Sequence, residues 1–149
     1  MKSLQIVSGD LVLSPSGRAR TVEGLDKLRQ DLHLWLSEPL GIGYTTASFG
    51  TRLNDLMFGS NDELSRQNVQ SEVLRVISVY KAWQGERLLQ TQSLGLLSNW
   101  KKSEIIAQIV EVVATRVLTS IVVKVVLTTL AGETISVELQ SGTQGIRVT

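Results

Sequence analysis

The chain is organised around one stretch, Ala47-Ser48-Phe49-Gly50-Thr51-Arg52-Leu53-Asn54-Asp55-Leu56-Met57-Phe58-Gly59. Gly50 gives the backbone the freedom that a tight turn into a helix requires. Leu53, Leu56 and Met57 follow at the spacing of one helical face, which predicts a short helical turn bracketed by two phenylalanines. Taken alone, this pattern is typical of a connecting helix that closes a hydrophobic core.

Composition limits the classes of protein to consider. The chain has 149 residues, no cysteine and a formal net charge of +1. This length predicts a single domain, residues 1–149, that buries a core without covalent staples. The absence of cysteine excludes a disulfide framework and a thiolate metal site. The near-neutral charge gives no electrostatic reason to expect a nucleic-acid or membrane surface, and we expect no cofactor.

The first third of the chain predicts a hairpin followed by a helix. Apolar runs at 4–7 and 11–13 are joined across Ser8-Gly9-Asp10, a plausible hairpin turn. A helix is expected from Thr21, as N-cap, to Ser37, where Pro39 prevents its continuation. A glycine-rich loop over 40–48 then leads into the opening stretch.

The middle of the chain predicts one clear helix and one poorly defined region. Ser60 to Glu63 has the spacing of a capping box, and an apolar stripe then runs from Val69 to Trp83. Gly85 is expected to end this helix. Residues 84–103 lack a clean period and are interpreted as a loose helical or irregular insertion.

Beyond the insertion the apolar period changes to two. Strands are predicted over 105–115, 117–129 and 134–140, and residues 141–149 are interpreted as a flexible tail. The segment 105–130 contains charged residues and β-branched side chains, which argues against a membrane span. The predicted fold is therefore α+β, with a short N-terminal β-hairpin and helices packed on a C-terminal three-stranded antiparallel sheet. The central strand is apolar on both faces, so one face is expected to meet something other than the helices.

Support for catalysis is weak. His33 lies on the polar side of a predicted helix and no serine sits in a nucleophile elbow, so a solvated or interface histidine is the preferred interpretation. One histidine without cysteine makes a zinc site improbable. Paired carboxylates could support glycoside cleavage, and the candidates are Glu38, Asp55, Glu63 and Glu72. Helix capping explains Glu63 better, and an i,i+3 pair with Arg75 explains Glu72 better. We therefore predict no catalytic residue and no metal site.

With these elements in place, the chain resembles the small wedge proteins of contractile-tail baseplates, found in bacteriophages and, as a related component, in type VI secretion baseplates. The opening stretch matches the aromatic-Gly-Ser/Thr, x-Leu-x-x-Leu, x-Phe signature of that family. The flanking helices and strands follow in the expected order over most of the chain, apart from residues 84–103. The matching motif residues are Phe49, Gly50, Thr51, Leu53, Leu56 and Phe58.

The resemblance implies a structural subunit, not an enzyme. It would join the baseplate to the tail sheath and template the first sheath layer by strand addition. Its partners would be other baseplate wedge proteins and the tail sheath protein. Several copies of the chain, six in number, would form a ring. It would reside in the virion, in the tail baseplate, after assembly in the host cytoplasm. For strand addition, the edges of interest are the terminal strand with its tail and the short N-terminal strand.

One departure from the family is important. The long helix of the family commonly ends in Glu-Pro-Arg-Ile, which seats the wedge protein on its neighbour, whereas this chain reads Tyr80-Lys81-Ala82-Trp83. We hypothesise that Trp83 and Trp100 take over that contact, although both could instead simply close the core. The predicted partner-binding residues are Tyr80, Trp83, Trp100, Lys101, Lys102, Thr134, Ser136, Glu138 and Gln140. Some family members have been labelled lysozyme-like, so a cell-wall glycosidase is the alternative function.

Overall fold

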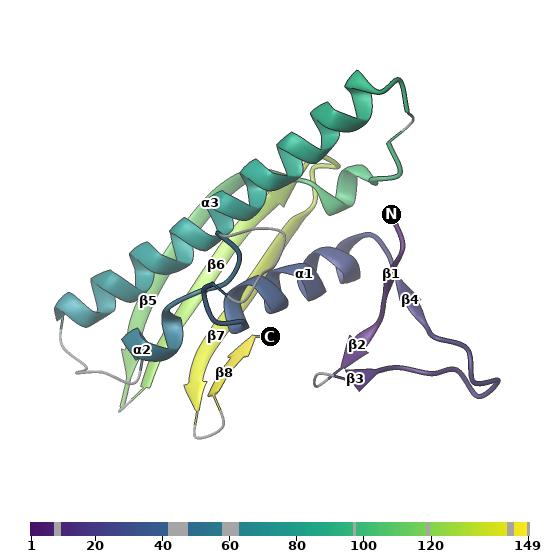
Figure 1. Ribbon diagram of the computed structural model, residues 1–149. Coiled ribbons are helices and arrows are strands. Elements are labelled where there is room, and N and C mark those ends of the chain that lie inside the picture. The colour runs from purple at the N-terminus through teal and green to yellow at the C-terminus, as the bar shows by residue number, and fades with distance from the viewer. Residues whose placement is uncertain are drawn as a thin grey trace.

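The computed structural model shows three helices on one face of a four-stranded antiparallel sheet (Figure 1). The structure describes residues 1–7, 10–41, 48–57, 63–96, 98–118, 120–142 and 145–148. The sheet has the order β5-β6-β7-β8. Its strands are β5 (Ile106–Val117), β6 (Ser120–Thr129), β7 (Thr134–Gly142) and β8 (Gly145–Val148). The predicted α+β class is confirmed, including the three antiparallel strands that follow the helices.

The fourth strand corrects one expectation. The sequence predicts a flexible tail over 141–149, but β7 extends to Gly142 and β8 pairs with it, Leu139 opposite Val148. A short hairpin satisfies backbone groups that a free tail would leave to water. Because β8 covers β7 only alongside Leu139–Gly142, it shields only the second half of that strand.

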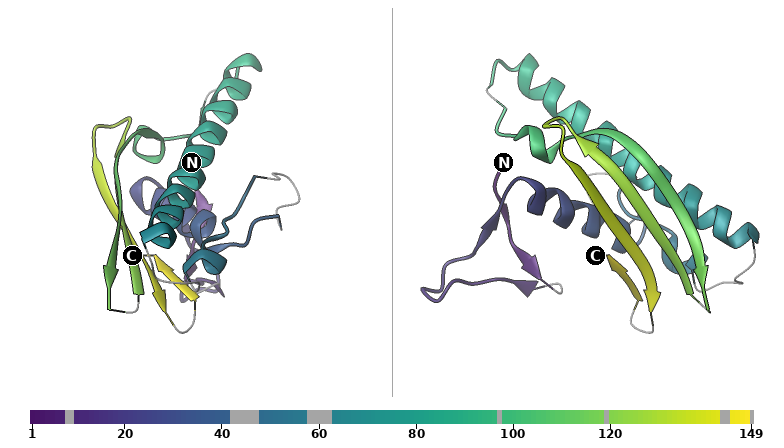
Figure 2. Two further views of the ribbon diagram at one scale, coloured as in Figure 1. Left: turned by 90° about the vertical axis from the view of Figure 1, so that its left-hand side faces the viewer. Right: turned by 180° about the vertical axis from the view of Figure 1, so that it is seen from behind.

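One face of the sheet forms the core. Side chains on β6 alternate, so that Ile121, Val123, Val125 and Leu127 are buried while Lys124 is exposed. Both α1 (Leu25–Ser37) and α3 (Glu63–Ser93) lie over this face, and the opposite face carries no described element (Figure 2). That bare face matches the expectation that the helices cover only one side of the central strand.

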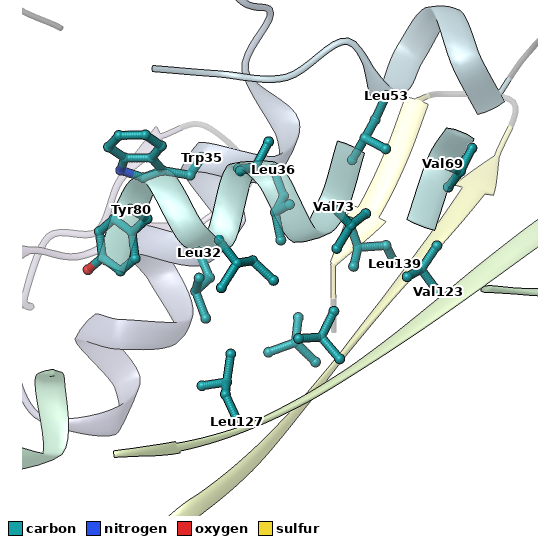
Figure 3. Packing of buried hydrophobic residues seen from close by; sticks show 14 of the residues in the cluster. Leu32, Trp35, Leu36, Leu53, Val69, Val73, Tyr80, Val123, Leu127 and Leu139 are labelled. Atoms are coloured by element: carbon teal, nitrogen blue, oxygen red, sulfur yellow. The ribbon is translucent and has the colours of Figure 1, made fainter. Parts of the chain in front are cut away.

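The helices bury the stripes that their sequences predict. On α1, Leu28, Leu32 and Leu36 are fully buried. On α3, the buried stripe consists of Val69, Val73, Val76, Ile77 and Tyr80. The predicted helical turn is α2 (Leu53–Met57), whose two end residues are buried. These side chains meet those of the strands in one cluster (Figure 3).

The end of the long helix differs from the prediction. α3 passes through Gly85 to Ser93, so half of the supposed insertion is regular helix. A turn closes the helix after Ser93, at Gly95, which has a φ of 65°. There the Leu96 N–H donates to Thr91 O and the Gly95 N–H donates to Gln92 O, each at 3.0 Å, as in a Schellman motif. Gly85 costs the helix some stability, but the helix formers on both sides offset it.

The start of the first helix also differs. α1 begins at Leu25 with Gly24 as N-cap, and Thr21 lies in a two-residue strand, β4 (Thr21–Val22), paired with β1 (Ser3–Leu4). The side chain of Thr21 therefore does not cap the helix. Instead, the Gly24 N–H donates to a carboxylate from a distant part of the chain, Glu104 Oε1, at 2.8 Å.

The predicted N-terminal hairpin is present as β2 (Ile6–Val7) paired with β3 (Asp10–Leu11), although Ser8 and Gly9 lie outside the described residues. These strands belong to an arm that projects away from the sheet (Figure 1). Gln30 on α1 holds the arm, because its side chain accepts from the Ile6 N–H and donates to Leu4 O, both at 2.9 Å.

Two further features complete the fold. A 3-10 helix, η1 (Lys102–Glu104), leads into β5. Among the described residues, no helix is long and apolar enough to cross a membrane.

Candidate functional site

The aromatic side chains gather in one place. The five that the structure describes form a continuous series of ring contacts, with centroids 4.9–6.2 Å apart. They are Trp35, Phe49, Tyr80, Trp83 and Trp100. We call this set the aromatic cluster. It brings Phe49 of the predicted motif together with Tyr80, Trp83 and Trp100, three of the predicted partner-binding residues.

The aromatic cluster runs from the core to the surface. Trp35, near the end of α1, is 6% exposed, and Tyr80 is fully buried. Phe49, Trp83 and Trp100 are partly buried. Tyr80 therefore cannot contact a partner directly, contrary to its predicted role. Trp83 and Trp100 are neither fully buried nor fully exposed, which suits both the docking hypothesis and the alternative that they close the core.

A buried ion pair lies beneath the aromatic cluster. Lys27 is 3% exposed and pairs with Asp31 one helical turn later. Its Nζ atom lies over the ring of Trp100, 4.6 Å from the ring centroid. The Tyr80 hydroxyl donates to Asp31 Oδ2 at 2.8 Å. Burial, followed by the charge of Asp31, raises the pKa of Tyr80. Tyr80 therefore stays protonated and serves as a hydrogen-bond donor.

The outer part of the aromatic cluster lines a hollow of about 200 Å³. Its walls include Trp83, Trp100, Phe49, Lys27 and Asp31. This volume is below the range of typical small-molecule pockets but is large enough for one side chain. An apolar hollow with aromatic walls and a buried charged pair is typical of a position that accepts an anchoring residue of another protein.

The turn at Gly50 is held by a second ion pair. Gly50 adopts a φ of 96°, and an added Cβ would lie 2.5 Å from Pro39 O, so the predicted requirement for glycine is confirmed. Glu72 accepts from the Arg52 N–H at 2.9 Å and from Arg75 at 2.7 and 2.8 Å. Arg75 also donates to Gly50 O at 3.1 Å. The turn is thus fastened to α3; Phe58, the last motif residue, lies outside the described residues.

The environment of Glu72 opposes a general-acid role for this carboxylate. Burial alone would raise the pKa of Glu72, but the hydrogen bonds from Arg75 and the Arg52 amide outweigh burial and lower it. Asp55 and Glu72 both line a hollow of about 490 Å³ beside α2. A glycosidase acid needs a raised pKa, and Glu72 has the reverse. Within the described ranges, no group of three potential metal ligands occurs, and His33 is exposed on α1.

The remaining predicted partner-binding residues lie in two places, on β7 and directly after Trp100 in the chain. Alternate residues of β7 point away from the helices and are exposed, namely Thr134, Ser136, Glu138 and Gln140. Lys101 and Lys102 are also exposed, and Lys101 Nζ pairs with Glu23 at 2.9 Å. Both α1, which carries Trp35, and α3, which carries Tyr80 and Trp83, lie over the other face of the sheet (Figure 2). The exposed β7 side chains and the aromatic cluster therefore do not share one partner surface.

Two polar anchors were missed by sequence reasoning. Gln84 is 1% exposed; it donates to Glu104 O at 2.7 Å and accepts from the Ile106 N–H at 3.0 Å. Glu104 is fully buried, and its carboxylate accepts from Gly24 and Lys101 amides and from the amino group of Met1. Gln84 follows Tyr80 by one helical turn and so continues the buried stripe of α3. This spacing is the one signal in the sequence that indicates burial of Gln84.

Comparison with known proteins adds no relative: no family model, no curated protein and no solved structure matches the chain.

Proposed function

We propose that the chain is a structural subunit of a contractile-tail baseplate wedge, which joins the baseplate to the tail sheath. The observation that carries this proposal is the conjunction of the family motif with the aromatic cluster. Phe49 enters the cluster directly from the Gly50 turn, and Glu72 and Arg75 fasten that turn to α3. A rigid turn beside half-buried tryptophans is a preorganised docking surface.

The aromatic hollow is the proposed seat for a neighbouring baseplate protein. The ring centroids of Trp83 and Trp100 lie 6.0 Å apart, and both partly buried residues line the hollow together with the Lys27–Asp31 pair. In this proposal they perform the docking that the Glu-Pro-Arg motif performs in the family. Aromatic side chains in such hollows commonly supply most of the binding free energy of an interface.

The sheet supplies the second proposed contact. Because β8 pairs with β7 only from Leu139 onward, the Thr134–Glu138 part of β7 has no strand on that side among the described residues. The opposite border of the sheet is β5. Unpaired strand borders accept extended segments through main-chain hydrogen bonds. In a ring of six copies, these borders would template the first sheath layer.

The test is to locate the chain in particles. The tagged chain would be expressed in the bacterium that carries the gene, and contractile particles would be isolated on a density gradient. Immunogold label is expected at the baseplate end, with six copies per particle by quantitative mass spectrometry. Absence of the chain from purified particles would contradict the proposal.

A matched pair of variants tests the docking surface. Trp100→Ala should reduce incorporation into particles while the isolated chain stays folded. Leu89→Ala, an exposed α3 residue outside the aromatic cluster, should leave incorporation unchanged. Equal incorporation of both variants would remove the aromatic cluster from the interface.

The glycosidase alternative has its own test. Purified chain should leave a suspension of bacterial cell wall turbid. Clearing of the suspension that Asp55→Asn abolishes would instead support cleavage at the hollow shared by Asp55 and Glu72.

A further inference from the structure

β5 is an unusually open edge strand. It has 12 residues, against a usual strand length of about five or six. Natural edge strands are commonly blunted with lysine, proline or bulges, and Ile106–Val117 contains neither lysine nor proline. Its two register shifts lie before Glu111, so the pairing with β6 is regular from Glu111 to Val117. The second half of β5 therefore offers a regular edge.

The backbone of this edge already binds a substitute partner. The Ala114 N–H donates to Gln70 Oε1 of α3 at 3.3 Å and therefore points away from β6. Main-chain groups alternate along an antiparallel strand, so Val112 and Arg116 direct their amides to the same side. The side-chain amide of Gln70 is chemically a peptide group, and its carbonyl occupies the position that a neighbouring strand would fill.

A groove borders the first half of β5 and reaches the regular edge at Glu111 and Val112, because the β5 residues that line it are 108–112. Two hollows of about 240 and 550 Å³ lie between α3 and β5 and share Ile109. On α3 they are lined at about one-turn intervals by Gln70, Leu74, Ser78 and Lys81. Leu74 is 44% exposed and Val110 is 54% exposed. We call this feature the α3–β5 groove; its helix wall and strand floor are the geometry of domains that bind peptides by strand addition.

We propose that the α3–β5 groove receives an extended segment of a partner protein, which adds to the sheet as a strand beside β5. The segment pairs with the outward amides of Val112, Ala114 and Arg116 and displaces the Gln70 amide. Its alternate aliphatic side chains cover Leu74 and Val110. The inference rests on the strand addition proposed above and names the accepting edge, which is neither the terminal strand nor the N-terminal strand favoured by sequence.

Amide hydrogen exchange measured by NMR tests the pairing directly. The probe is a synthetic peptide that alternates valine with threonine, and its control is the same peptide N-methylated at alternate amides. Adding the probe should slow exchange at Val112, Ala114 and Arg116 by about tenfold or more. Val113 and Thr115, whose amides face β6, serve as internal controls and should not change. Equal protection by the N-methylated peptide, or no protection, would overturn the proposal.

Three variants test whether the peptide binds specifically at the α3–β5 groove. Gln70→Ala removes the substitute partner and should tighten peptide binding several-fold. Val110→Lys places a charge in the α3–β5 groove and should weaken binding at least tenfold. Val113→Lys, on the outer face of the same strand, is the matched control and should bind as the unaltered chain does. Unchanged binding by Val110→Lys, or weaker binding by Gln70→Ala, would contradict the assignment.

Failure here is distinguishable from failure of the proposed function. If the peptide does not bind but the chain is present in purified particles, only the choice of edge is wrong. If the peptide protects β5 but particles lack the chain, the baseplate role is wrong, and the assignment of the α3–β5 groove as a peptide-binding site still holds. Protection that rises with concentration of the chain alone would identify a second copy as the occupant and overturn the assignment of a partner segment.

Discussion

The carboxylate of Glu72 and the guanidinium of Arg75 form a two-point contact, at 2.7 and 2.8 Å, one turn apart on α3. Glu72 is 4% exposed, and both residues also bind the backbone of the turn from Gly50 to Arg52. A local i,i+3 pair on one helix thereby fixes a motif that lies about twenty residues earlier in the chain.

The first prediction concerns acid stability. The pKa of Glu72 is below its usual 4.5, so this carboxylate stabilises the fold above that value, and its contribution is lost as pH falls through the lower folded-state pKa. Glu72→Gln should lower the free energy of unfolding at pH 7 by about 3 kcal/mol, because it leaves a partly buried guanidinium without its counter-ion. Urea unfolding between about pH 7 and pH 3 should show this difference shrinking with acid.

The control for that prediction is Glu63→Gln. Glu63 pairs with Arg66 at the surface, and removing an exposed ion pair should barely move the urea midpoint. A Glu72→Gln deficit that stays constant across the whole pH range would contradict the assigned electrostatic role.

The second prediction compares two glycines with positive φ. Gly50→Ala should destabilise the chain by about 3 kcal/mol, because the new Cβ would meet Pro39 O at 2.5 Å in addition to the backbone strain. Gly132 has a φ of 82° but open space around it, so Gly132→Ala should cost only about 1 kcal/mol. Thermal unfolding of both variants measures the difference, and equal losses would show that the close approach at Gly50 is unimportant.

Local patterns made part of the fold predictable from sequence. The stripe from Val69 to Tyr80 and the turn at Gly50 depend on residues close together in the chain, and both are present. Gly85 predicts a helix end because glycine is common there, but the residues after it favour helix and α3 continues. The glycine that closes the helix is Gly95, which has a positive φ, and not Gly85.

The polar anchors could not be found in the same way. Gln84 is satisfied by backbone groups of Glu104 and Ile106, and Glu104 by Gly24 and Met1, far away in the chain. Apart from the position of Gln84 one helical turn after Tyr80, no short-range pattern reports these buried side chains, because most of their partners are distant. For the candidate site, sequence identified Trp83 and Trp100 but not the Lys27–Asp31 pair beneath them.

The third prediction uses Gly85. It lies inside α3 without positive φ, and nothing lies within 4 Å of an added Cβ. Gly85→Ala should therefore stabilise the chain by about 0.5–1 kcal/mol, since alanine favours the helix and restricts the unfolded chain. A lower melting temperature for this variant would indicate that the helix does not run through residue 85.

The fourth prediction concerns the start of β5. Gln84→Leu removes the groups that satisfy Glu104 O and the Ile106 N–H, so unfolding should become easier by about 3 kcal/mol. Amide exchange at Ile106 should accelerate more than exchange elsewhere in β5. Gln92→Leu is the control, because Gln92 is exposed near the end of α3. Similar effects of the two substitutions would contradict an anchoring role for Gln84.

The fifth prediction separates docking from core packing in the aromatic cluster. Trp100 is only partly buried and touches Trp83 and Lys27, so Trp100→Ala should cost about 1–2 kcal/mol of folding free energy. Trp35 is 6% exposed and contacts three other rings, so Trp35→Ala should cost about 4 kcal/mol. Urea unfolding measures both. If Trp100→Ala is as destabilising as Trp35→Ala, Trp100 is a core residue, and the proposed seat for a neighbouring protein loses its main anchor.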